Sequence, residues 1–144
     1  MTEVTLPHTW RPFGVRMAAL LVGVGLAVVC AAAWFAFPPE IRAMFTLFQK
    51  GTLVVMGAGL FVMGHALVRS KVVATEAGLV VVNGYRTREF AWPQALAVRL
   101  PAGAPWAVLD LADGTSCPMM GIQGSDGAQA RRAVLELRSL LDRP

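Results

Sequence analysis

The architecture is decided first by residues 17–37, which read MAALLVGVGLAVVCAAAWFAF. None of these 21 residues is charged, and a helix of that length covers roughly 30 Å, the thickness of the hydrocarbon layer of a bilayer. Arg11 and Arg16 precede the run, Trp34 lies where interfacial aromatic residues occur, and two prolines follow. A secretory signal peptide is the alternative, but such peptides have shorter apolar runs and end at a small-residue cleavage site. The run therefore predicts a transmembrane helix.

A second apolar run, TLVVMGAGLFVMGHALV at residues 52–68, predicts a second membrane span. Residues 43–48 extend it if the Lys50 side chain reaches the interface. Small residues let membrane helices pack closely, and we expect this of Gly23 and Gly25 in the first span and of Gly57, Gly59 and Gly64 in the second. Within this run we expect His65 to form a hydrogen bond at headgroup level or between the helices. A proton relay is the alternative, less favoured because neither span offers an acidic partner.

The distribution of positive charge predicts the orientation of these spans. Lys and Arg near the span ends number four on the side of the two termini (Arg11, Arg16, Arg69, Lys71) and two in the connecting loop (Arg42, Lys50). Cytoplasmic flanks carry the excess of such residues. We therefore predict a multi-pass protein of the inner (plasma) membrane. Residues 1–16 form a cytoplasmic N-terminal segment, 17–68 a two-helix transmembrane hairpin, and 69–144 a cytoplasmic soluble domain.

Composition excludes several classes of function. Hydrophobic residues make up 56% of the chain and charged residues 15%, with a mean hydropathy of +0.56 and a net charge of +4. From residue 69 onward nine basic residues face seven acidic ones, and no aromatic residues alternate with a basic stripe, so nucleic acid is not an expected partner. Cys30 and Cys117 lie in different parts of the chain, and no Cys or His stands at metal-ligand spacing from another. We predict neither a disulfide nor a metal site.

After residue 70 the pattern changes to short β-branched runs separated by turn residues, which is typical of an antiparallel sheet. We predict strands at residues 72–75, 79–82, 85–91, 96–100, 106–111 and 116–120. Asn83-Gly84 predicts a type I′ hairpin turn and Asp113-Gly114 a second hairpin. Pro93 and Pro118 should mark strand ends or edges. We expect Trp92 and Trp106 to be core residues that pack under the last helix.

The last segment predicts an amphipathic helix, capped by Ser125 or Asp126. Its apolar stripe consists of Ala130, Val134, Leu137 and Leu141. Because one such helix cannot bury its apolar side alone, it should close an open end or face of the sheet. The predicted fold class is a membrane α-helical hairpin followed by a small α+β domain, an antiparallel sheet or partial barrel capped by one C-terminal helix.

This arrangement resembles the bacterial pleckstrin-homology-like (PH-like) domains, and in particular the membrane-anchored family typified by low-molecular-weight protein antigen 6. The resemblance covers about half of the chain and consists mostly of turn and core positions. The matching runs are Val73-Ala74, Glu76-x-Gly78-Leu79, Asn83-Gly84-x-Arg86-Thr87-Arg88, Phe90-x-Trp92, Val98-Arg99, Pro105-Trp106-Ala107, Leu109-x-Leu111-Ala112-Asp113-Gly114, Met120-Gly121-Ile122-Gln123 and Arg131-Arg132-Ala133.

The resemblance suggests phosphoinositide binding, but the sequence departs from that pattern. Lipid-binding members of the wider family place several bases around the loop that joins their first two strands. In the predicted strand order this loop is Glu76-Ala77-Gly78, which contains no base. Arg86, Arg88 and Arg99 are the candidate contacts for anionic headgroups or for a partner, and solvated arginines on a sheet face are the alternative. We expect any lipid affinity to be weak and non-specific.

The sequence offers no catalytic constellation. It lacks a nucleophile paired with a base, paired carboxylates and a P-loop, and the predicted soluble domain contains no histidine. The loop at Gly121 and Gly124 precedes a helix, and a plain helix-entry loop is favoured over an anion site. We therefore predict no enzyme and no cofactor. The expected function is a membrane-anchored protein-interaction module at the cytoplasmic face, with an unknown protein partner. The alternative is a structural or assembly subunit, and a homo-oligomer through the transmembrane helices is also considered.

Overall fold

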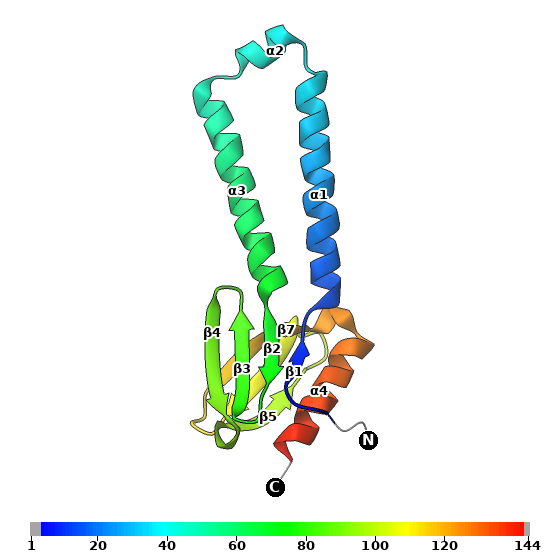
Figure 1. Ribbon diagram of the computed structural model, residues 1–144, viewed down its shortest axis with the longest axis vertical. Coiled ribbons are helices and arrows are strands. Elements are labelled where there is room, and N and C mark those ends of the chain that lie inside the picture. Colours follow the sequence, from blue (N-terminus) through cyan, green and yellow to red (C-terminus); the bar gives the residue numbers. More distant parts are fainter. Residues whose placement is uncertain (1–3, 143–144) are drawn as a thin grey trace.

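The computed structural model describes residues 4–142 and shows a long helical hairpin standing on a two-sheet domain (Figure 1). Helices α1 (Phe13–Ala36) and α3 (Leu47–Arg69) are joined at the far end by the short α2 (Pro39–Met44). Both long helices are apolar enough to cross a membrane, and neither buries a residue within the structure. The two predicted helices are confirmed. Each begins about one turn earlier than its apolar run, because helical hydrogen bonding continues past the charged residues Arg16 and Lys50.

The expectation of glycine-mediated packing between α1 and α3 was wrong. A Cβ atom built on any of the five glycines would meet no other atom within 4 Å. The five positions are Gly23, Gly25, Gly57, Gly59 and Gly64. The helices stand apart along much of their length (Figure 1), and their lower ends are held by contacts with the domain.

Seven antiparallel strands form two sheets, which do not close on each other, so the domain is a partial barrel. The first sheet has the order β1 (His8–Trp10), β2 (Lys71–Ala74), β3 (Gly78–Asn83), β4 (Arg86–Ala91). The second has the order β5 (Ala95–Arg99), β6 (Trp106–Leu111), β7 (Ser116–Gln123). All six predicted strands are present. Five match within one residue, and β7 runs three residues further than expected.

Strand β1 was not predicted, and it changes the topology of the domain. It pairs with β2, with Trp10 opposite Val72. The transmembrane hairpin is therefore an insertion between two neighbouring strands of one sheet, and the segment before α1 is part of the folded domain. Trp10 is buried, and its indole N–H donates to the Glu136 carboxylate at 2.8 Å. Three residues are too few to show a strand periodicity, and the pairing partner lies about 60 residues away.

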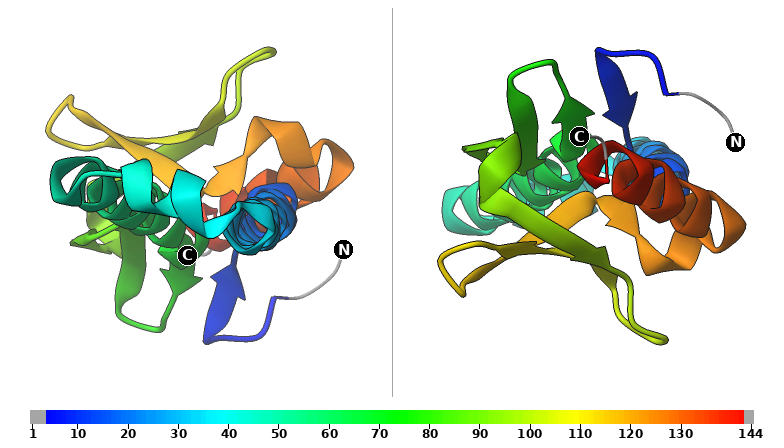
Figure 2. Two further views of the ribbon diagram at one scale, coloured as in Figure 1. Left: turned by 90° about the horizontal axis from the view of Figure 1, so that it is seen from above. Right: turned by 90° about the horizontal axis from the view of Figure 1, so that it is seen from below.

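Helix α4 (Ala128–Leu141) packs against β5 and β7 on the side of the domain that carries β1 (Figure 2). Its predicted apolar stripe is confirmed at Ala130, Val134 and Leu137, which are buried, while Leu141 is partly buried. The predicted cap was wrong. The N-cap is Gly127, which makes no side-chain hydrogen bond, because the preceding 3-10 turn η2 (Gly124–Asp126) directs Asp126 toward α1 instead.

The tryptophan predictions were also wrong in part. Trp92, in the 3-10 turn η1 (Trp92–Gln94), packs at the edge of the core. Its indole N–H lies 3.1 Å from the carbonyls of both Thr75 and Glu76, so it holds the β2–β3 loop. Trp106 is half-buried and lies outside the core cluster. The buried tryptophan that contacts α4 is Trp10.

The β3–β4 hairpin also differs from the prediction. The residues of its two-residue loop are Gly84 and Tyr85, and only Gly84 has positive φ, which fits a type II′ turn. Asn83 therefore ends β3, opposite Arg86. Its side-chain amide donates to the Pro118 carbonyl at 2.6 Å and accepts from the Met120 N–H at 2.9 Å. Asn83 thus joins the two sheets.

Candidate functional site

The first candidate surface is strand β4, which is an edge of the four-stranded sheet. Five of its six residues are exposed. Arg86 and Arg88 are two positions apart and so lie on one face, while Thr87 and Glu89 lie on the other. In Figure 1, β4 lies at the outer side of the domain, below α3. The structure therefore keeps two of the three predicted arginines together on an open strand.

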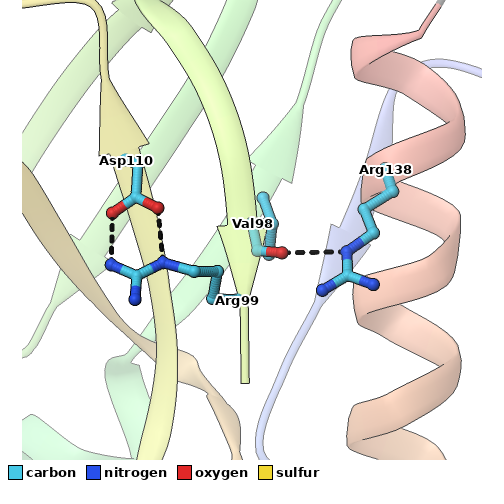
Figure 3. Close-up of polar contacts among 4 residues, drawn as sticks. All are labelled: Val98, Arg99, Asp110 and Arg138. Carbon is cyan, nitrogen blue, oxygen red and sulfur yellow. Dashed lines mark hydrogen bonds and ion pairs between the residues drawn. The ribbon is translucent and has the colours of Figure 1, made fainter. Parts of the chain in front are cut away.

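The third predicted arginine, Arg99, lies elsewhere, on β5 in the other sheet. Its guanidinium makes a two-point contact with the Asp110 carboxylate on β6, with Nη2 2.6 Å from Oδ1 (Figure 3). This hydrogen-bonded pairing lowers the pKa of Asp110 and raises the pKa of Arg99. Arg99 is thus already paired with a carboxylate. Among residues 4–142 no carboxylate pairs with Arg86 or Arg88, and Arg88 lies close to the buried Cys117 thiol.

The Glu76-Ala77-Gly78 loop lies far from the long helices. It connects β2 to β3 at the end of the sheet opposite to α1 and α3 (Figure 1). This loop therefore cannot reach a ligand at the level of the helix feet, and it also contains no basic residue. Gly121 was predicted to lie in a helix-entry loop, but it lies within β7, where it has a packing role. A Cβ atom on Gly121 would lie 2.6 Å from the backbone of Lys71, so glycine allows β7 to cross close to β2.

The second candidate feature is the junction at which the domain holds α1. The Asp126 carboxylate accepts hydrogen bonds from the backbone N–H groups of Phe13, at 2.9 Å, and Gly14, at 2.8 Å. These are the first two residues of α1, whose amides have no partner within the helix. A carboxylate at this position also faces the positive end of the helix dipole. Asp126 therefore caps α1 from a segment more than 110 residues away in sequence.

A matching set of contacts holds the end of α3. The C-cap residue Ser70 is fully buried, and its hydroxyl donates to the Ala66 carbonyl and accepts from the Gly84 N–H at 2.9 Å. On the same hairpin loop, the Tyr85 hydroxyl lies 2.8 Å from His65 Nδ1. The guanidinium of Arg69 lies over the Tyr85 ring, 5.7 Å from its centroid. His65 therefore contacts the soluble domain. Its hydrogen-bond partner is Tyr85 of the domain and not a residue of the other helix.

Together these contacts fix how the domain sits on the hairpin. Polar side chains in this junction hold the helix ends in place. The sequence did not predict these roles, because each side chain contacts a segment that is distant in the chain. The preference of Asp for helix N-termini was a usable signal for Asp126, but it indicated the wrong helix. In the part of the chain that the structure describes, no group of three His, Cys, Asp or Glu side chains is placed to hold a metal ion.

Comparison with known proteins agrees with this fold. A family model described as "Bacterial PH domain" matches residues 69–140, which run from the end of α3 to α4 and leave β1 and most of the hairpin outside. The chain is also 35% identical to the uncharacterised proteins Rv1417 of Mycobacterium tuberculosis and Mb1452 of Mycobacterium bovis, over 98% of this chain and 90% of each relative. No solved structure matches. The chain belongs to the bacterial PH domain family.

Proposed function

We propose that the chain is a membrane-anchored protein-interaction module without catalytic activity, which presents its PH-like domain at the cytoplasmic face. Strand β4 is the proposed docking edge, and its occupant is an extended, acidic segment of a partner protein. The observation that carries this proposal is the exposed edge strand with Arg86 and Arg88 on one face, on a domain clamped to both long helices.

The chemistry of an edge strand supports strand addition. Such an edge presents unpaired backbone N–H and C=O groups that an extended peptide can satisfy. Side chains of the added strand at alternate positions would face Arg86 and Arg88, which selects for acidic residues there. The competing explanation is that the two arginines only guard the edge against aggregation, a common role of charge on edge strands.

The cytoplasmic location rests on the excess of Lys and Arg near the lower ends of the helices. Single cysteines test it, introduced in the 101–105 loop of the domain or in the 40–44 segment of the helical connection, after replacement of Cys30 and Cys117. In intact cells a membrane-impermeant thiol reagent should label the second position and spare the first. The opposite labelling would place the domain outside.

Photo-crosslinking tests the docking edge. A photoreactive residue in place of Thr87 on β4 should give an adduct of defined mass with one partner protein, and the same residue at the exposed Leu96 on β5 should not. Replacing Arg86 and Arg88 by Glu should abolish the adduct. The matched control replaces the exposed helix residues Arg131 and Arg132 by Glu, with the same change in charge. Equal loss in both double variants, or no adduct at Thr87, would contradict the proposal.

A second candidate function is a structural or assembly subunit. The specific observation in its favour is that α1 and α3 bury no residue within the structure, so their apolar faces are available to other membrane helices as well as to lipid. Photoreactive residues at Leu21 and Val54, both about two-thirds exposed, test it. Adducts there instead of at Thr87 would favour this function, and an adduct of twice the chain mass would identify a homo-oligomer.

A further inference from the structure

The feet of the two long helices and the outer face of the four-stranded sheet border an open hollow of about 600 Å³. Four basic residues line it: Arg11, Arg16, Arg69 and Lys71. Among the described residues that line it, the only other ionisable side chain is that of His65. The floor is apolar and includes Val73 and Val80.

The topology explains why these bases meet. Arg11 and Arg16 lie at the start of the helical insertion, and Arg69 and Lys71 lie at its end. The antiparallel pairing of β1 with β2 closes the insertion, with Trp10 opposite Val72. Continuing this register by one residue places Arg11 opposite Lys71. Like charges directly opposite each other on neighbouring strands destabilise a sheet, unless an anion between them offsets their repulsion.

No carboxylate of the described chain neutralises this cluster. Within residues 4–142, the contacts of a carboxylate with a basic side chain at ion-pair distance are His8–Glu136 and Arg99–Asp110, and neither involves a base of the hollow. No Asp or Glu is among the described residues that line it. The ring of Tyr85 under Arg69 supplies an aromatic face but no negative charge. The hollow therefore gathers four positive charges with no acidic counterpart among residues 4–142.

The position of the hollow indicates the source of the anion. Arg16 lies in the first turns of α1 and Arg69 is the last residue of α3, so both stand where the apolar parts of these helices give way to the domain. For a hairpin that crosses a membrane, this level is the headgroup layer of one leaflet. Lys and Arg are the side chains that bind phosphate oxygens most readily, through charge-assisted hydrogen bonds.

We propose that this hollow binds the phosphate of an anionic phospholipid headgroup at the foot of the hairpin. This inference rests on the membrane anchoring in the proposed function, but not on the docking edge at β4. The site is built from both ends of the insertion. A fragment that starts at Lys71 lacks three of its four bases and cannot report on it.

The test uses the full-length chain in detergent micelles, with native mass spectrometry to count bound lipids as phosphatidylglycerol or phosphatidylcholine is added. The parent protein should retain phosphatidylglycerol at least tenfold more tightly than phosphatidylcholine. Replacing Arg16 and Lys71 by Gln should remove most of that preference. The matched control replaces Arg131 and Arg132 by Gln, removes the same charge from exposed positions of α4 outside the hollow, and should bind within about twofold of the parent.

Three other outcomes would contradict the proposed lipid site. Equal loss in both double variants would show general charge attraction, and equal retention of the two lipids would show that no phosphate site exists. Displacement of the lipid by inorganic phosphate at the same concentration would assign the site to free phosphate instead. Near-ultraviolet circular dichroism shows whether each variant keeps its fold. Resistance to extraction from cell membranes by alkaline carbonate tests the anchoring separately, so that its failure is distinguishable from failure of the site.

Discussion

The capping of α1 by Asp126 leads to a prediction about the stability of the junction. Replacing Asp126 by Ala removes the only hydrogen bonds described for the Phe13 and Gly14 amides, which lie 2.9 and 2.8 Å from its carboxylate oxygens. Loss of an N-cap costs about 0.5–2 kcal/mol, and loss of a negative charge at the helix N-terminus adds about 0.3–1 kcal/mol at an exposed position. We expect the helix start to be destabilised by about 1–2 kcal/mol.

Amide hydrogen exchange of the full-length protein in micelles, measured by NMR, gives the readout at single residues. A change of 1.4 kcal/mol is tenfold in an equilibrium constant, so protection of the Phe13 and Gly14 amides should fall about tenfold, with little change in β6. The control variant Asp142→Ala removes another exposed carboxylate of the domain and should leave these amides as in the parent.

A second variant tests the geometry without removing the charge. A Cβ atom on Gly14 would lie 2.8 Å from Asp126 Oδ1, so Gly14→Ala should displace the carboxylate and lower the protection of the Phe13 amide. Unchanged exchange at Phe13 in both Asp126→Ala and Gly14→Ala would refute the reasoning, because some other group would then have to protect the start of α1.

Three further predictions concern the domain. In chemical denaturation of the full chain, Trp10→Ala should lower the free energy of unfolding by about 3–5 kcal/mol, and Trp106→Ala should lower it by clearly less. Equal effects of the two substitutions would contradict the placement of Trp10 in the core. Gly121→Ala should lower the free energy of unfolding by about 1–3 kcal/mol, because the added Cβ atom would lie 2.6 Å from the Lys71 backbone. The control Gly23→Ala adds a Cβ atom in open space and should leave the stability unchanged. A Gly121→Ala variant as stable as the parent would show that β7 can move away from β2. The hydrogen-bonded contact with Arg99 lowers the pKa of Asp110, so the pair stabilises the fold above the unfolded pKa of about 3.9, and this stabilisation is lost as pH falls through the lower folded value. Asp110→Asn should therefore reduce the loss of folding stability below about pH 4. An unchanged dependence of stability on acidic pH would argue against the pair in solution.

Much of the fold was predictable because it depends on local pattern. The uncharged runs specify two long helices through hydropathy alone, and the alternation after residue 70 specifies six strands within a few residues. The stripe of α4 was likewise readable from the spacing of Ala130, Val134 and Leu137. The resemblance to bacterial PH-like domains rested on turn and core positions, and the family model over residues 69–140 supports it.

The candidate sites were less predictable because they depend on contacts between distant segments. Arg86 and Arg88 share a strand, so their proximity followed from the sequence. No pattern in the sequence indicated that Asp110 engages Arg99. The basic hollow combines residues from before and after the helical hairpin. Only the pairing of β1 with β2 brings those residues together.

The sequence by itself determined the two apolar helices, the strand meander and the amphipathic last helix, since each follows from periodicity and composition over neighbouring residues. Only the tertiary structure decided that three residues before the first helix complete the sheet, that Asp126 caps α1, and that Ser70 joins α3 to the Gly84 turn. The physical reason is the same in each case. A single hydrogen-bonding side chain or a three-residue strand carries no periodicity, and its partner is selected by the packing of segments far apart in the chain.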